Sequence, residues 1–308
     1  MFKTNNMKNE GIGYVVFSVI NILFMLILIV LTLFPYLNIL AKSLNDGIDS
    51  LRGGITLIPR KFTFENFQIL LKDAEMYTAA IVTLSRVTIL VAASILVQFM
   101  TAYTLSRKNL WGLKVINVFY LIPMFISGGL IPQYVLFSKM HLLNNFWVYV
   151  LPGIFSFYNV MLIRSYITSS ISDEIIEAAR IDGSGEVRML LQFILPLSKP
   201  ILATIALWTA VNAWNDWTTT MYYITDSSLY TLQYKLMQTI KETERMAALI
   251  QSAIENGQNV EQLTKSMTVT TDSLQSAQII FVTLPIICVY PFLQKYFVKG
   301  ITLGSVKG

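Results

Sequence analysis

Two charged residues and a row of polar and aromatic residues lie within otherwise apolar segments of the 308-residue chain. The charged residues are Arg86 and Asp216. At helical spacing, one face of the segment around Asp216 carries Trp208, Asn212, Asn215, Thr219 and Tyr222. Aromatic rings can cover the apolar face of a sugar ring and amides can hydrogen-bond its hydroxyls, so this row is a candidate sugar path. The alternative is an interfacial aromatic belt.

Arg86 and Asp216 are expected to lie at a similar depth in the membrane. With a helical rise of 1.5 Å per residue, Arg86 is about 30 Å from Arg107 and Asp216 is about 24 Å from Pro200. Both positions fall in the outer third of the bilayer. We predict that the two residues pair, directly or through water, as a gate or a structural clamp. The alternative is that Arg86 extends to the membrane interface on its own.

The sequence contains few residues of the types that catalysis or metal binding requires. Cys288 is the only cysteine and His141 is the only histidine. One cysteine excludes an internal disulfide and a multi-cysteine metal site. An intramembrane enzyme would need a convergent nucleophile, base or metal set. We therefore expect no catalytic residue, no metal site and no cofactor in this chain.

The composition is that of a membrane protein. Hydrophobic residues make up 54% of the chain and charged residues 13%, with a mean hydropathy of +0.57. Soluble domains carry roughly 25% charged residues, which is about twice as many. At roughly 20 residues for each helical crossing, the length allows several spans but no large soluble domain. The expected fold class is an all-α polytopic membrane protein.

Runs without charged residues predict six membrane-spanning helices, since an unpaired charge at the bilayer centre is costly. The second predicted span contains Arg86 and the fifth contains Asp216. The six segments lie within 11–41, 77–106, 114–139, 142–163, 200–223 and 272–295.

The distribution of Lys and Arg predicts the orientation of these spans. Basic residues gather in the short connection after the second span and in the C-terminal tail, so both ends are expected in the cytoplasm. We predict a single transmembrane domain over 14–299, between cytoplasmic ends 1–13 and 300–308. The connection 169–199 is then cytoplasmic and the loop 224–272 is outside. This rule accounts for the basic excess without a nucleic-acid partner.

The cytoplasmic connection predicts a short helix, a sharp turn and a second short helix. Ser172 can cap the first helix, with Asp173 and Glu174 favoured at the positive end of its dipole. Gly183 and Gly185 are expected to end it.

One face of this first helix carries Ile175, Ala178, Ala179 and Asp182. The small side chains would let another protein approach closely. The alternative is an amphipathic linker lying on the membrane surface.

The string Glu177-Ala-Ala-Arg-Ile-Asp-Gly183, followed by Ile194-Leu-Pro196, resembles the EAA motif of binding-protein-dependent ABC importer permeases. The resemblance covers nearly the whole chain and includes strings typical of the maltose-type permeases and of their complex-polysaccharide branch. These strings begin at Thr101, Pro123, Leu195 and Pro291.

The resemblance implies the type I permease fold, with a cytoplasmic coupling helix that docks into a separate ATPase. It assigns ATPase docking to Glu177, Ala178, Ala179 and Gly183, and Asp182 also fits the carbohydrate branch.

The resemblance also implies a set of partners in a bacterial plasma (inner) membrane. The sequence has no phosphate-binding loop of the form Gly-x-x-x-x-Gly-Lys-[Ser/Thr], so ATP and Mg²⁺ are expected on the separate ATPase. The implied complex contains a second permease subunit as a heterodimer, two ATPase subunits, and an extracellular lipoprotein or periplasmic substrate-binding protein. The implied substrate is an oligosaccharide or polysaccharide fragment. The chain would be a transport subunit and not an enzyme.

Two alternatives remain open for the function. One is an ABC importer permease for a non-sugar solute. The other is an ion-coupled secondary transporter, a class that usually shows internal repeats and several intramembrane carboxylates, whereas this chain has only Asp216 and no evident repeat. The outer loop 224–272 is either a docking surface for a substrate-binding protein or a lid packed over the spans.

Overall fold

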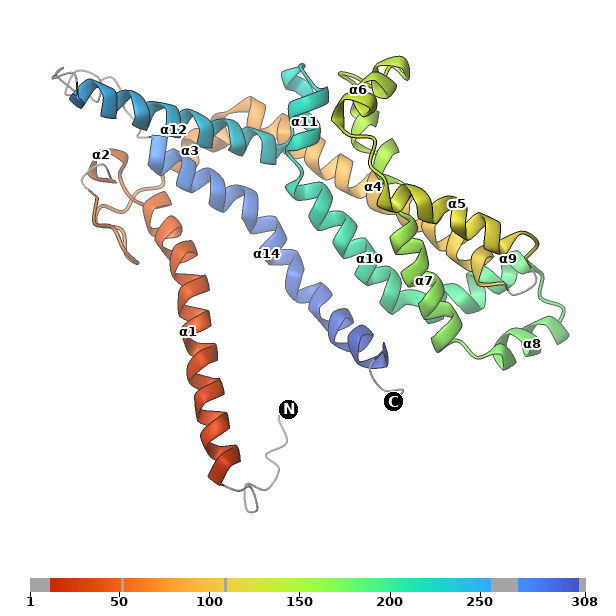
Figure 1. Cartoon of the computed structure of the whole chain (residues 1–308). Coiled ribbons are helices and arrows are strands. Elements are labelled where there is room, and N and C mark those ends of the chain that lie inside the picture. The colour runs from red at the N-terminus through yellow and green to blue at the C-terminus, as the bar shows by residue number, and fades with distance from the viewer. Residues whose placement is uncertain (1–11, 51–52, 108–109, 256–270, 305–308) are drawn as a thin grey trace. The chain divides into compact units, whose positions relative to one another are not determined.

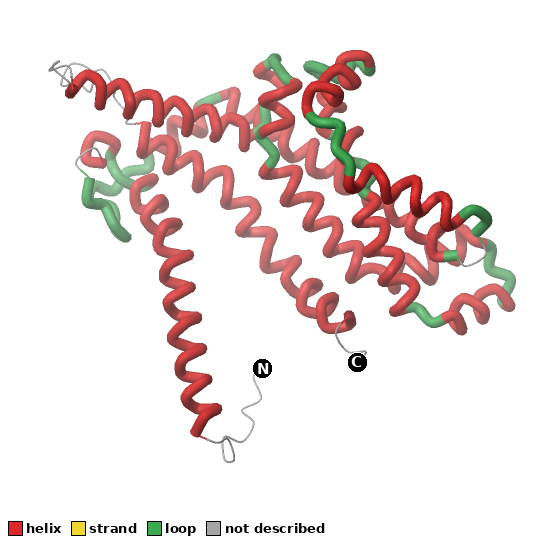
Figure 2. Tube along the Cα trace, viewed as in Figure 1, coloured by secondary structure: helices red, strands yellow, loops and turns green. Residues whose placement is uncertain are grey.

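A computed structural model describes residues 12–50, 53–107, 110–255 and 271–304, and these residues are helical and connecting segments without a β-strand (Figures 1 and 2). The chain divides into two compact units. The first contains residues 1–72 and 239–281, and the second contains residues 73–238 and 282–308. The predicted all-α fold class is confirmed.

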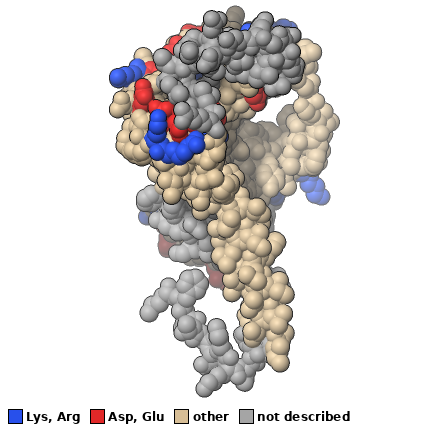
Figure 3. Space-filling view, turned by 90° about the vertical axis from the view of Figure 1, so that its left-hand side faces the viewer, with Lys and Arg blue, Asp and Glu red and all other residues tan. Residues whose placement is uncertain are grey.

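Helix α1 (Ile12–Ser43) is the first element of the first unit. Its 32 residues carry one charged side chain, Lys42 in the last turn. The surface of this helix therefore forms a continuous tan column in Figure 3. Pro35 lies inside the helix, as is tolerated in membrane-spanning helices.

Two buried asparagines organise the segment that follows α1. Asn45, before α2 (Gly47–Ser50), donates its amide to the Asp49 carboxylate at 3.1 Å. Asn66, on α3 (Glu65–Lys72), donates to the Ser43 carbonyl at 2.9 Å and accepts the Ser273 hydroxyl at 3.2 Å. The bonds therefore tie this segment to the start of α14 (Thr271–Gly304).

Two ion pairs lie in this part of the chain. The hydrogen bond from Asn45 and the nearby Arg60 guanidinium hold the pKa of Asp49 below its ordinary value. Lys42 and Asp272 form an ion pair of 3.2 Å.

The second unit is built on three long helical segments. Helix α4 (Ala74–Ser106) packs along α7 (Phe157–Ser170) and α10 (Leu195–Asn215). Asp73 caps the first turn of α4 by accepting from the backbone of Glu75 at 2.9 Å. Apolar residues from all three helices form the core, including Phe99, Val160, Ile163, Ile167 and Ile205.

The predicted third span is broken into two helices. Helices α5 (Leu113–Phe125) and α6 (Leu130–Lys139) meet at an angle of 115°. The break falls on the run Ser127-Gly-Gly129, and Gly129 has a φ of +84°, which favours glycine. The expectation of one continuous helix was wrong here, because the glycines end it.

The predicted fourth span is also bent. It begins with the short 3₁₀ helices η1 (Phe146–Tyr149) and η2 (Leu151–Gly153), which meet α7 at 45°. Pro152 and Gly153 disfavour a regular α-helix, and Ser156 caps the start of α7.

The predicted fifth span ends earlier than the sequence suggested. Helix α9 (Glu186–Arg188) leads through a π-helical stretch, η3 (Met189–Ile194), into α10. Helix α10 stops at Asn215, and α11 (Thr218–Tyr223) begins separately. Asp216 has an extended backbone between them and accepts the Thr219 N–H at 3.1 Å, which is the behaviour of a helix cap.

The connection 169–199, which the sequence analysis predicted to be cytoplasmic, contains the predicted helix and turn. Helix α8 (Asp173–Ile181) ends with Gly183 at a φ of +76°. The Ser184 N–H binds the Ala179 carbonyl and the Gly183 N–H binds the Arg180 carbonyl, which together form a Schellman motif. Ser172 occupies the N-cap position but its hydroxyl makes no capping hydrogen bond, so that detail of the prediction was wrong.

The segment after α11, which was predicted to be an outer loop, is mainly one helix. A 3₁₀ turn, η4 (Ser227–Leu229), precedes α12 (Leu232–Glu255). The first N–H of α12 binds the Thr83 hydroxyl on α4 at 2.9 Å. Residues 256–270 of the predicted loop 224–272 lie outside the described residues, as do residues 1–11 and 305–308 of the predicted ends. Helix α14 continues to Gly304, beyond the predicted domain end at 299.

Four helical segments in the described ranges are long and apolar enough to cross a membrane: Ile12–Ser43, Ala74–Ser106, Glu186–Asn215 and Asp272–Val289. Each bent pair, α5 with α6 and η1–η2 with α7, satisfies the same criteria when it is taken as one span. The described residues therefore provide between four and six crossings.

Candidate functional site

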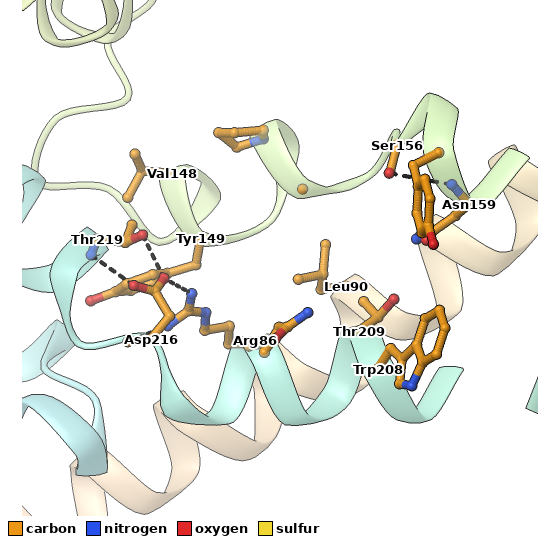
Figure 4. A pocket seen from close by; sticks show the side chains of 15 residues that line it. Arg86, Leu90, Val148, Tyr149, Ser156, Asn159, Trp208, Thr209, Asp216 and Thr219 are labelled. Atoms are coloured by element: carbon orange, nitrogen blue, oxygen red, sulfur yellow. Dashed lines mark hydrogen bonds and ion pairs between the residues drawn. The ribbon is translucent and has the colours of Figure 1, made fainter. Parts of the chain in front are cut away.

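A cavity of about 620 Å³ lies in the second unit, between α4, the η1–α7 segment and α10 (Figure 4). Its volume is typical of small-molecule sites. It is lined by Arg86, Leu90, Val148, Tyr149, Pro152, Gly153, Ser156, Tyr158, Asn159, Trp208, Thr209, Asn212, Ala213, Asp216 and Thr219.

Arg86 and Asp216 are paired at one end of the cavity. The Arg86 side chain is buried; its Nη1 donates to the Asp216 carbonyl at 2.9 Å and its Nη2 contacts the Asp216 carboxylate. Thr218 donates to the same carboxylate at 2.7 Å. The predicted contact is thus present, while its role as a gate or clamp stays a prediction.

Tyr149 completes this end of the cavity. Its ring lies 4.7 Å from the Arg86 guanidinium, a distance that allows a cation–π interaction. Its hydroxyl lies 2.9 Å from the Thr220 hydroxyl and donates to the Leu229 carbonyl at 2.8 Å. The ion pair is therefore connected to the segment that leads into α12.

The opposite end of the cavity is neutral. Trp208, Ser156 and Asn159 lie there, and Leu90 separates them from the ion pair in Figure 4. The Trp208 side chain is 40% exposed, so its ring is accessible. This end offers an aromatic surface with amide and hydroxyl groups, which suits a hydroxyl-rich neutral ligand.

The structure brings most of the predicted path residues together. Arg86, Trp208, Asn212, Asp216 and Thr219 line the cavity.

Asn215 and Tyr222 are not among the lining residues. The predicted row assumed one helix through residue 223, and the break at Asp216 places Tyr222 on α11 instead.

Ten of the fifteen lining residues were not predicted as parts of this site. Four of them are polar or aromatic residues of one segment: Tyr149, Ser156, Tyr158 and Asn159. They belong to the bent segment η1–α7, which the hydropathy pattern represented only as a span. The cluster of polar and aromatic residues directly after Pro152-Gly153 was the available signal.

The predicted ATPase-docking residues lie on and after α8. Glu177, Ala178, Asp182 and Gly183 are exposed. Ala179 is buried in the same core as Ile167 and Ile171, so it anchors α8 to the chain's own core. Four of the five predicted docking residues are therefore exposed for contact with another protein, and Ala179 is not.

A family model described as "Binding-protein-dependent transport system inner membrane component" matches residues 94–303. The chain is 31% identical to "Protein LplC" of Bacillus subtilis strain 168 over 308 residues, covering 100% of both chains. It is 28% identical to the "Polygalacturonan/rhamnogalacturonan transport system permease protein YtcP" of the same organism, covering 98% of this chain and 100% of that one.

A solved structure is similar over nearly the whole chain. It is a chain of a bacterial ABC transporter involved in the import of the acidic polysaccharide alginate, with 26% identity and a TM-score of 0.82. The match covers 94% of this chain and 100% of the other. Together with the several apolar helices, these matches identify a multi-pass membrane protein of a transport system. The chain belongs to the family of binding-protein-dependent transport system inner membrane components.

Proposed function

We propose that the chain is a permease subunit of an ATP-driven ABC importer that takes up oligosaccharides or polysaccharide fragments. An extracellular binding protein delivers the substrate, and two copies of a separate ATPase bind and hydrolyse ATP with Mg²⁺. A second permease subunit completes the membrane path.

The cavity between α4, η1–α7 and α10 is the observation that carries this proposal. Its neutral end combines the accessible ring of Trp208 with the amide of Asn159, and Asn212 adds a second amide to the lining. Its charged end contains one cation and one anion that neutralise each other. Such a site offers stacking and hydrogen-bonding groups for a hydroxyl-rich ligand. The names of the polygalacturonan and alginate transporters, to which the chain is similar, support a saccharide.

The proposed topology has six spans, with both bent pairs crossing the membrane and both ends in the cytoplasm. Helix α8 then lies on the cytoplasmic side, where its exposed residues Glu177, Ala178, Asp182 and Gly183 can dock into the ATPase. The C-terminal end of α4 and the turn after α8 lie on this same side.

The proposed transport cycle uses this arrangement. ATP binding closes the ATPase dimer and moves α8, which shifts the two permease subunits from an inward-open to an outward-open state. The substrate passes from the binding protein into the cavity. ATP hydrolysis then resets the complex.

Uptake measurements with labelled solutes test the substrate class. The gene is inactivated, and uptake is measured for a neutral oligosaccharide mixture, a galacturonate oligosaccharide mixture and a labelled amino acid. We expect loss of uptake of one oligosaccharide mixture, restored by the wild-type gene, with amino-acid uptake unchanged. Unchanged uptake of both sugar mixtures together with loss of the amino acid would contradict the proposal.

A further inference from the structure

The carboxylate of Glu186 receives hydrogen bonds from two different elements. Glu186 is the first residue of α9, directly after the turn that ends α8. Its Oε2 accepts the Tyr103 hydroxyl at 2.5 Å and the Arg107 Nη2 at 2.6 Å, both from the end of α4. Its Oε1 accepts from Arg180, on α8, at 3.5 Å. One carboxylate therefore joins α4, α8 and α9.

Arg107 is held in place within this cluster. Its guanidinium lies 4.4 Å from the centre of the Tyr103 ring, and its Nη2 also contacts the Tyr103 hydroxyl. Only 20% of the Arg107 side chain is exposed. An isolated surface ion pair contributes little to stability, but a network in which one partner is packed has a defined geometry.

A second ion pair, Arg86 with Asp216, joins α4 and the end of α10 far from Glu186. Helix α4 runs for 33 residues without Gly or Pro and carries Arg86. The chain after Glu186 continues through η3 into α10 and reaches Asp216, the partner of Arg86. Helices α4 and α10 pack along each other between these two pairs. The Glu186 cluster and the wall of the cavity therefore lie at the two ends of the same pair of packed helices.

We propose that Glu186 is a positioning residue that fixes the turn after α8 to the end of α4, so that movement of α8 reaches the cavity. Glu186 acts through Arg107 and Tyr103 and does not contact substrate or ATP. This inference rests on the proposed docking of α8 to an ATPase.

The test measures how accessible the cavity is in the purified complex while the ATPase is trapped with orthovanadate. A cysteine replaces Asn212 in a Cys288→Ser background, and its rate of maleimide labelling is measured with and without ATP, Mg²⁺ and orthovanadate. With Glu186 intact, trapping is expected to change the labelling rate severalfold, because the accessibility of residue 212 changes as the cavity opens or closes. In Glu186→Gln we expect the ATPase to remain bound at normal stoichiometry, and the change in labelling rate to fall below about twofold, since coupling is lost.

Further variants separate positioning from folding. Arg107→Gln should resemble Glu186→Gln, and the double variant should be no worse than either, because both substitutions remove the same interaction. Tyr103→Phe removes a single oxygen and should give an intermediate loss. Arg188→Gln is the matched control, since Arg188 is exposed in the same segment and donates to Gln192 at 2.9 Å instead.

The outcomes distinguish this inference from the proposed function. If no ATPase co-purifies with the chain with Glu186 intact, the proposed function fails and the inference fails with it. If the ATPase is present and Glu186→Gln responds normally, the inference alone is overturned. Loss of the ATPase from Glu186→Gln together with a normal response in Tyr103→Phe would also overturn it, because Glu186 would then serve assembly.

Discussion

At the scale of single residues, Arg86 is a buried charge whose side chain is held by one partner. It is 3% exposed on an apolar helix, and both Nη groups are satisfied by Asp216. Its Nε has no hydrogen-bond partner in the described part of the chain. Removal of one partner of a buried pair leaves an uncompensated charge and costs about 3–5 kcal/mol.

We therefore predict that Arg86→Ala and Asp216→Ala each reduce oligosaccharide uptake strongly, and that the double variant is no worse than either. Uptake per membrane-inserted subunit is the measurement. The control is the partly exposed pair Lys42 and Asp272, where alanine substitution should have little effect. Simple additivity of the Arg86 and Asp216 effects would show that the two side chains act independently.

Trp208 provides a second prediction at this scale. Its accessible ring lines the neutral end of the cavity, so Trp208→Ala should raise the KM for oligosaccharide uptake several-fold. Trp208→Phe keeps an aromatic ring and should have a KM close to that of the wild type. Trp111→Ala is the matched control, since Trp111 is 94% exposed outside the cavity. Equal effects at both positions would indicate a general role of tryptophan in membrane anchoring.

At the scale of elements, the two bent pairs decide the topology. If both pairs cross the membrane, residue 140 between them is outside. If both pairs are re-entrant, the chain crosses four times and residue 140 stays in the cytoplasm. The two ends of the chain lie on the same side in either case, so only the region between the pairs discriminates.

We predict that Met140→Cys, in a Cys288→Ser background, is labelled by an impermeant maleimide from outside intact cells. Met140 follows α6 and is 52% exposed. Ser227→Cys is the outer control and Val187→Cys the cytoplasmic control, and both residues are exposed. Protection of residue 140 with normal labelling of residue 227 would replace six spans by four.

The turn after α8 gives a second element-scale prediction. Gly183 has a positive φ, so Gly183→Ala should strain the turn by about 1–2 kcal/mol. We expect less ATPase to co-purify with this variant. Gly185→Ala is the matched control, because Gly185 has a φ of −70° and open space at its Cβ position. Equal loss of ATPase in both variants would mean that the strain at Gly183 is not the cause.

At the scale of the whole molecule, the described surface requires an apolar environment. Helix α5 has no buried side chain, and Val115, Phe119 and Phe125 are each exposed. Lipid and a second permease subunit can both cover such a surface.

We predict that the tagged chain, solubilised mildly, is recovered with a second permease and an ATPase. Mass spectrometry and the size of the purified particle are the measurements. A particle that contains this chain alone, in membranes where the neighbouring genes are expressed, would contradict the proposed complex.

The sequence by itself determined which segments are apolar, and it predicted the helix and glycine turn around α8 and the pairing of Arg86 with Asp216. These features depend on local composition, on residues close together in the chain, or on the high cost of an unpaired charge in the membrane. The breaks at Gly129 and Asp216 were missed, because hydropathy counts apolar residues and does not register turn and cap chemistry.

Only the tertiary structure decided which side chains share the cavity. Tyr149 reaches the ion pair through packing of η1 against α4 and α11, and Glu186 meets Tyr103 across 83 positions of sequence. Such contacts depend on how the helices pack in three dimensions. A one-dimensional pattern of apolar and polar residues contains no measure of those distances, so neither the place of Tyr149 in the cavity nor the Glu186 cluster could be assigned before the fold was known.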